Sequence, residues 1–367
     1  MSIEAPRATG PGDGASVPTD TAFGAVERAA VLRSRAAARV RRIGVGLSLG
    51  AGVLLVAAVS LCVGESLIPL PDVLSTLAGQ GSRNTNYVVL ELRLPRIVTA
   101  ILVGIAFGMS GTVIQSLLGN PLASPDVIGI STGASTAAVF GIVLFGLDGL
   151  GVSAMALGGA LLTAAAMYAL AWRNGVTGYR LILVGIGLAA LLLSVISYFM
   201  TRAQVTSASD ALVWISGSLS GRNWSQAVPL AITLAVLVPV TVLLARVLGL
   251  LGMGDDAAKG LGVPVQQARL GLLVSAVALA GVATAASGPI AFVALLAGPI
   301  GRRLARDGSP ALLASALVGA LIVLVADFLA QHTPGLPLLP VGVLTGAIGA
   351  PYLLFQLATM NRAGRGG

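Results

Sequence analysis

Residues 93–126 read RLPRIVTAILVGIAFGMSGTVIQSLLGNPLASPD, and this stretch decides the fold class. No charged residue lies between Arg96 and Asp126. A helix of about 20 mostly apolar residues is long enough to cross the roughly 30 Å hydrocarbon core of a bilayer. Proline suits the first turn of a helix, where its missing N–H would have no partner. The stretch therefore predicts a membrane-spanning helix over residues 97–117, entered through Pro95.

The composition of the whole chain agrees with a membrane protein. Of its 367 residues, 56% are hydrophobic and 10% are charged, and the mean hydropathy is +0.94. Soluble domains carry about 25% charged residues. The net charge of +8 does not indicate nucleic-acid binding, because the basic residues lie in short gaps between apolar runs and aromatic residues make up only 4% of the chain.

Apolar runs of similar length recur along the chain and predict an all-α membrane protein with ten crossings. They lie near residues 43–63, 97–117, 127–147, 151–171, 180–200, 226–248, 270–287, 289–301, 311–330 and 340–358. The eighth run is short and contains Pro289 and Pro299. If it is a broken helix, its backbone must face protein or water, because lipid cannot satisfy free N–H and C=O groups.

The predicted membrane domain covers residues 43–360 and leaves a cytoplasmic tail on each side. Within the N-terminal tail, residues 1–42, the first 20 are rich in small residues and proline and predict disorder, whereas Thr21–Arg42 predicts an Ala- and Arg-rich helix. The length of this tail does not fit a secretory signal peptide. The C-terminal tail, residues 361–367, is short.

The positions of the basic residues predict the topology. With ten crossings and both termini inside, 17 of the 22 Lys and Arg residues fall in inner segments and five in outer segments. Basic residues concentrate in the cytoplasmic loops of membrane proteins. We therefore expect both termini in the cytoplasm and the protein in the cytoplasmic (inner) membrane. The outer basic residues are Arg83, Arg93, Arg96, Arg202 and Arg222.

Small residues recur at helical spacing, and the chain has 48 glycines. Gly104–Gly108, Gly108–Thr112 and Gly185–Ala189 each place two small residues on one helix face, which lets membrane helices approach closely. We expect these faces at helix–helix contacts. A glycine-lined pathway is an alternative that is compatible with such packing.

The chemistry-bearing residues disfavour several functions. Cys62 and His332 are the only cysteine and histidine, so we expect neither an internal disulfide nor a metal site built on these residue types. Lys259 is the only lysine and precedes Gly260, so the phosphate-binding triplet Gly-Lys-Ser/Thr does not occur. The chain is therefore predicted to bind no cofactor and to be no enzyme. An ATP-driven function would require ATP and Mg²⁺ bound by another subunit.

An ion-coupled carrier is disfavoured because such carriers bury ionisable groups near the bilayer midplane. No glutamate lies in a predicted span, and only Asp126 and Asp327 come near one, each at its end. A secondary carrier and a non-transporting scaffold nevertheless stay open as rival hypotheses.

Five segments rich in proline, glycine or polar residues interrupt the apolar pattern and are the candidate functional elements. Arg93 and Arg96 either anchor a helix end by snorkelling or bind carboxylates of a partner. Asp126 is expected to cap the helix that follows it. The segment Gly254–Pro264 is either a solvated connector or a docking element for an ATPase. It has short-helix character and glycines that permit a sharp bend. The segments are Leu92–Arg96, Gln115–Ser135, Gly254–Pro264, Ser287–Arg302 and Leu339–Tyr352.

In combination and in order, these segments resemble the FecCD family of ABC importer permeases, over about residues 43–360. That family carries iron–siderophore complexes, haem and vitamin B12. The resemblance implies ten helices per subunit, two permease subunits around a central pathway, two cytoplasmic ATPase subunits and an extracytoplasmic substrate-binding protein. The matching motifs are RLPR at 93–96, NPLASP at 120–125, GDDAA at 254–258, GPIAF at 288–292, LPVG at 339–342 and GAP at 349–351.

The resemblance also implies a docking site for the binding protein. Arg93 and Arg96 would meet glutamates of that protein. Gln331 stands where the family has a further arginine, and this departure weakens one docking contact.

Two further elements are implied on the cytoplasmic side. The gate maps to Thr177, Gly178 and Tyr179, where the small hydroxyl pair of the vitamin B12 permease is not preserved. The ATPase coupling loop maps to Gly254, Asp255, Asp256, Ala257, Ala258, Lys259, Gly260, Leu261 and Gly262.

The string SPDVIGISTG, residues 124–133, is most similar to the permeases for ferric catecholate or hydroxamate siderophores. Those permeases often work as two different chains. The resemblance therefore implies a ferric-siderophore substrate, moved by alternating access, and favours a heterodimer over a homodimer. Import of haem or cobalamin is the alternative within the family.

Overall fold

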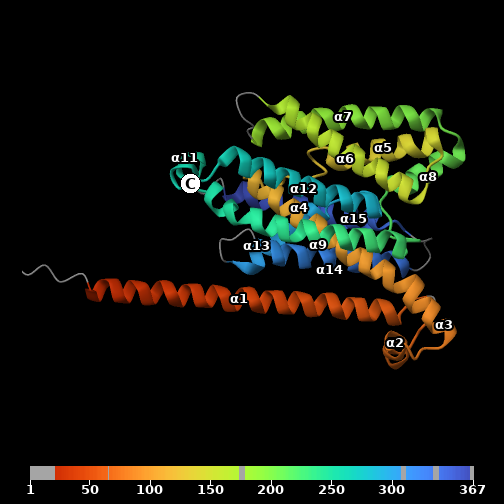
Figure 1. Ribbon diagram of the computed structural model, residues 1–367, viewed down its shortest axis with the longest axis horizontal. Helices are drawn as coiled ribbons and strands as arrows, with labels where there is room; N and C mark the ends of the chain where they lie inside the picture. The colour runs from red at the N-terminus through yellow and green to blue at the C-terminus, as the bar shows by residue number, and fades with distance from the viewer. Residues whose placement is uncertain (1–20, 65, 173–177, 307–310, 334–338, 364–367) are drawn as a thin grey trace, which may run out of the picture. The chain divides into compact units, whose positions relative to one another are not determined.

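The computed structural model describes residues 21–64, 66–172, 178–306, 311–333 and 339–363, and every regular element in these ranges is a helix (Figure 1). The chain divides into two compact units, residues 1–41 and 42–367. The described part of the first unit is helical from Thr21, as predicted. The predicted disorder of residues 1–20 lies outside the described residues.

Each of the ten predicted crossings corresponds to a helix. The ten helices are α1 (Thr21–Cys62), α4 (Leu94–Leu118), α5 (Ile130–Phe145), α6 (Gly149–Ala171), α7 (Gly178–Arg202), α9 (Trp224–Leu244), α12 (Val265–Ser287), α13 (Val293–Ala305), α14 (Leu312–Gln331) and α15 (Val341–Ala363). Short elements join them: α2 (Leu70–Leu77), α3 (Arg83–Asn86), the π-helical η1 (Tyr87–Arg93), α8 (Val205–Ile215), the 3₁₀ turn η2 (Ala245–Val247), α10 (Leu248–Leu251) and α11 (Asp255–Gly260).

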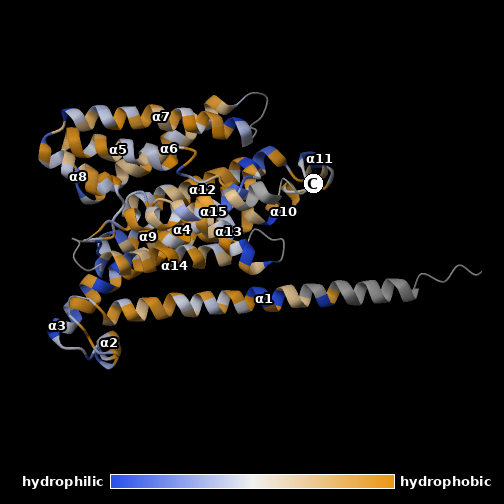
Figure 2. Cartoon of the chain, turned by 180° about the vertical axis from the view of Figure 1, so that it is seen from behind, coloured by the Kyte–Doolittle hydropathy of each residue, from blue (hydrophilic) through white to orange (hydrophobic). Residues whose placement is uncertain are grey.

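Among the described residues, seven helical segments are long and apolar enough to cross a membrane. Figure 2 shows hydrophobic residues along the length of the bundle helices. The helices α5 and α13 are shorter than a full crossing. As expected for the eighth run, α13 begins only after Pro289, and its first residues, Val293 and Ala294, are fully buried by protein. Pro299 lies inside α13.

The apolar stretch of residues 97–117 forms the central helix of the membrane domain. Most residues of α4 are buried, and the helix packs against α9, α12, α13 and α14. The helix begins at Leu94, where η1 runs directly into it, so its start agrees with the sequence prediction. Pro95 occupies its first turn, where the missing N–H costs little.

The small-residue faces lie at helix contacts, as predicted. A Cβ atom added to Gly104 would lie 2.5 Å from the carbonyl oxygen of Gly319 on α14. One added to Gly108 would overlap the carbonyl oxygen of Ser315, also on α14, and one added to Gly185 would lie 2.8 Å from that of Ile128. Glycine therefore allows α4 and α14 to pack backbone against backbone.

The helix ends gather at two ends of the bundle. At the first, called the Arg96 end, α4 begins and α14 finishes, joined by Arg96 and Asp327. At the second, called the α11 end, α4 finishes beside the end of α13, where Arg302 donates a hydrogen bond of 2.7 Å to Gln115. This alternation agrees with the predicted order of crossings.

Candidate functional site

The three predicted docking residues line one pocket at the Arg96 end. Arg93, Arg96 and Gln331 border a pocket of about 420 Å³, together with Ser66 and His332. They come from η1, α4 and α14. The fold thus brings together residues that lie more than 230 positions apart in the sequence.

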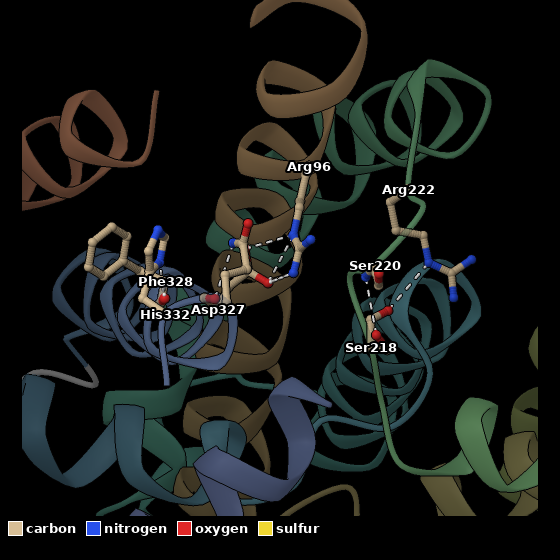
Figure 3. A network of polar contacts seen from close by, with 8 residues as sticks. Arg96, Ser218, Ser220, Arg222, Asp327, Phe328 and His332 are labelled. Atoms are coloured by element: carbon tan, nitrogen blue, oxygen red, sulfur yellow. Dashed lines mark hydrogen bonds and ion pairs between the residues drawn. The ribbon is translucent and has the colours of Figure 1, made fainter. Parts of the chain in front are cut away.

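Arg96 forms a bidentate ion pair with Asp327. Its Nε lies 3.1 and 3.0 Å from the two carboxylate oxygens, and its Nη2 lies 2.8 Å from Oδ1. The side chain of Asp327 is only 4% exposed, and that of Arg96 is 17% exposed. Gln331 Nε2 donates to the same carboxylate at 2.9 Å. Figure 3 shows this network, in which Asp327 receives donors from two helices.

The network gives Gln331 a role inside the chain. An arginine at this position would bring a second cation to a carboxylate that Arg96 already neutralises. A glutamine amide instead donates a hydrogen bond without adding charge. Gln331 therefore suits the ion pair of Arg96 and Asp327, which the sequence analysis did not predict.

Arg93 holds the turn that follows α1. Its Nη1 donates to the carbonyl oxygen of Leu61 at 2.6 Å, and its Nη2 donates to that of Ser66 at 2.6 Å. These bonds tie the start of α4 to the end of α1. Its side chain is partly exposed at the pocket, so it combines a structural role with access to the surface.

A further arginine of this end lies in the segment between α8 and α9. Arg222 points toward Ser218, whose carbonyl oxygen accepts from its Nε at 3.4 Å (Figure 3). Burial lowers the pKa of its guanidinium. The adjoining Trp224 donates from Nε1 to the carbonyl oxygen of Leu90 in η1, at 2.9 Å.

The predicted coupling loop contains a short exposed helix at the opposite end. Gly254 and Gly262 flank α11 with φ angles of +101° and +80°, which glycine adopts without strain. Asp255 accepts an ion pair of 2.7 Å from Arg269 of α12. Leu261 is 63% exposed at the tip of the loop. The sequence reading of a short helix with sharp bends is confirmed.

The predicted gate is only partly described. Thr177 lies outside the described residues. Gly178 is the first residue of α7 and packs against Leu118 at the end of α4, and Tyr179 is 76% exposed. The assignment of these residues as a gate stays a prediction.

A second cavity was not anticipated from the sequence. It measures about 430 Å³ and lies between α5, α7, α8 and α15. Hydroxyl groups of Ser131, Ser135 and Ser216 border it, beside apolar residues such as Val343. The signal in the sequence was the cluster of hydroxyl residues in ISTGAS, residues 130–135, at the start of α5.

Asp126 also lines this cavity, and its predicted role was wrong. The residue that caps α5 is Gly129, in the left-handed conformation, with no side-chain cap. Asp126 lies three positions earlier and accepts a hydrogen bond of 2.5 Å from Ser131 Oγ. Two tight turns separate it from the helix, so its carboxylate reaches a side chain instead of the first backbone N–H groups.

The fold is that of the membrane subunit of an ABC transporter: a solved structure assigned to the metal-chelate type, in an inward-facing conformation, matches with a TM-score of 0.75 and 24% identity, covering 86% of this chain and 99% of that one. The model of the FecCD transport family matches residues 52–359, and the chain belongs to that family.

Several characterised relatives are similar over most of their length. The ferric enterobactin transport system permease FepG of Escherichia coli is 40% identical, over 82% of this chain and 91% of its own length. The achromobactin transport system permease CbrC of Dickeya dadantii is 42% identical, over 83% and 88%. The iron(3+)-hydroxamate import permease FhuG of Bacillus subtilis is 37% identical, over 83% and 93%.

Proposed function

We propose that this protein is the permease subunit of an ATP-driven importer for a ferric siderophore. The observation that carries the proposal is the match to the FecCD transport family over residues 52–359, with siderophore permeases at about 40% identity. The cavity between α5, α7, α8 and α15 supports a transport role. Its lining is mostly apolar, with hydroxyl groups and the carboxylate of Asp126 at its border, and weak binding favours release of the substrate.

The Arg96 end is proposed as the docking face for a substrate-binding protein. The pocket lined by Arg93, Arg96 and Gln331 supports this assignment. Because Asp327 already neutralises Arg96, Arg93 is the better candidate for direct contact with carboxylates of the partner. Arg96 would then act mainly by holding α4 and α14 together.

The α11 end is proposed to contact the ATPases. The side chain of Leu261 is exposed next to the glycine bend at Gly262, so it could bind in an apolar cleft of another protein. ATP and Mg²⁺ would bind to that partner. This assignment places the α11 end and both termini in the cytoplasm, and the protein in the inner membrane.

Two permease subunits would enclose the pathway, as a heterodimer with a second FecCD chain. The exposed apolar surface of α7 supports a helix partner, because Leu183, Ile186 and Leu191 are each at least half exposed in the described chain. Alternating access then moves the chelate between the two ends.

Reconstitution tests the proposal. The permease, its neighbouring permease, the ATPase and the binding protein are assembled in proteoliposomes, and uptake of ⁵⁵Fe-labelled siderophores is measured. We expect uptake that requires ATP and the binding protein. Uptake of haem or cobalamin instead would assign the alternative substrate, and uphill uptake by the permease alone, driven by an ion gradient, would overturn the proposal.

A further inference from the structure

A separate pocket lies at the α11 end, away from the pocket lined by Arg93 and Arg96 and from the cavity bordered by Ser131 and Ser216. It measures about 260 Å³ and is lined by residues from the middle of α1, the end of α9, η2, the end of α13 and the start of α14. Gly46 of α1 and Leu313 of α14 form facing walls, since a Cβ on Gly46 would lie 3.7 Å from the Leu313 side chain. The rest of the lining is mostly aliphatic.

The charged side chains among the described residues that line this pocket are all basic. Arg42 of α1 and Arg246 of η2 line it, and none of the described lining residues is acidic. Leu312 to Ala314, the first turn of α14, also border the pocket. The first N–H groups of a helix have no partner within the helix and attract anions. Two guanidinium groups and a helix start therefore converge on an apolar pocket.

The surroundings of the pocket are those of a lipid-facing surface. Ile43 and Leu47 of α1 are 54% and 70% exposed. Val242, Leu243 and Leu313 are also exposed at the neighbouring ends of α9 and α14. In a protein that spans the membrane, such aliphatic side chains at helix ends contact acyl chains, whereas arginines beside them reach the headgroup region.

We propose that this pocket binds an anionic phospholipid, with its phosphate between Arg42, Arg246 and the start of α14 and an acyl chain along Gly46 and Leu313. Basic pockets between membrane helices recognise anionic headgroups. The charge of the pocket, rather than its shape, would disfavour a zwitterionic lipid, because a choline group would bring a cation close to two arginines. A bound lipid would join the middle of α1 to the end of α9 and the start of α14.

Lipid retention by the full-length protein tests the proposal. The protein is purified in detergent, incubated with phosphatidylglycerol or with phosphatidylcholine of the same acyl chains, and examined by native mass spectrometry and thermal unfolding. We expect phosphatidylglycerol adducts and a higher melting temperature, and little of either with phosphatidylcholine. Replacing both arginines (R42Q/R246Q) should reduce phosphatidylglycerol retention by roughly tenfold or more, since each basic contact contributes about a fivefold preference.

Two further variants separate charge loss from misfolding. R303Q removes an exposed arginine of the same end that does not line the pocket, and it should retain the lipid fully. Gly46→Phe fills the pocket and leaves both arginines in place, and it should lose the lipid. Equal retention of the two lipids, full retention by R42Q/R246Q or Gly46→Phe, or equal stabilisation by inorganic phosphate would each overturn the proposal. So would a photo-crosslink from position 246 to another protein instead of to lipid.

Discussion

Arg96 and Asp327, 231 residues apart in the sequence, hold each other in a bidentate ion pair at one end of the bundle, with the carboxylate almost fully buried. The pair fastens the start of the central helix α4 to the end of α14. A buried carboxylate that loses its partner is costly, because neither water nor protein then compensates its charge. The pair therefore has a structural role that is separate from docking.

A charge swap distinguishes these two roles. Asp327→Ala should lower the free energy of unfolding by about 2–5 kcal/mol, because it leaves Arg96 unpaired in a partly buried site. The swapped protein R96D/D327R should recover much of this stability, measured by thermal unfolding in detergent. If Arg96 only fastens helices, uptake should recover too. Recovered stability without recovered stimulation of the ATPase would instead assign Arg96 to docking.

Charge reversal at Arg93 tests the docking face directly. Arg93→Glu should abolish the stimulation of ATPase activity by the loaded binding protein, because carboxylates of the partner would be repelled. Arg83→Glu, on the exposed helix α3 of the same region, is the matched control and should change the stimulation little. Unchanged stimulation in the Arg93 variant would remove it from the docking face.

The coupling loop offers a test of energy transfer. Leu261→Ser should reduce substrate uptake by about tenfold while the assembled complex still hydrolyses ATP, because truncating an anchor side chain in a protein interface costs about 1–2 kcal/mol. Asp256→Ala alters a fully exposed side chain of the same loop and should have little effect. Uptake per ATP hydrolysed is the quantity to compare, and an unchanged ratio in Leu261→Ser would exclude the loop from coupling.

Close packing of α4 and α14 predicts a sharp difference between two glycines. Gly104→Ala should destabilise the protein by about 1–3 kcal/mol, because its methyl group would overlap the backbone of Gly319 and Ala320. Gly187→Ala, on α7, meets no atom within 4 Å and should be neutral or slightly stabilising. The measurement is the melting temperature of each purified variant. Equal melting temperatures would contradict the close contact of α4 with α14.

A bulky side chain placed in the cavity bordered by Ser131 and Ser216 should block transport and leave the fold intact. Val343→Trp should fill the cavity beside Ser216 and stop uptake, since Val343 is half exposed and lines the open space. Val228→Trp, at a similarly exposed position on α9 outside the cavity, is the control. Normal uptake by the Val343 variant would place the pathway elsewhere.

The sequence by itself determined the ten apolar helices and their order. Hydropathy is a property of each local segment, so ten apolar runs predicted ten helices, and the composition of Gly254–Pro264 predicted a short helix with a sharp bend. The small-residue spacing of α4 predicted a close contact but not its partner. Family motifs such as NPLASP are also local patterns, so they indicated the class of transporter without the tertiary structure.

Only the tertiary structure decided which distant side chains meet. The pairing of Arg96 with Asp327 depends on the relative rotation and height of α4 and α14, and no local pattern encodes either. The same holds for the cavity bordered by Ser131 and Ser216 and for the basic pocket of Arg42 and Arg246. Asp126 shows the limit most clearly: its residue type favoured a helix cap, but two turns and a left-handed Gly129 placed the helix start three residues farther along the chain.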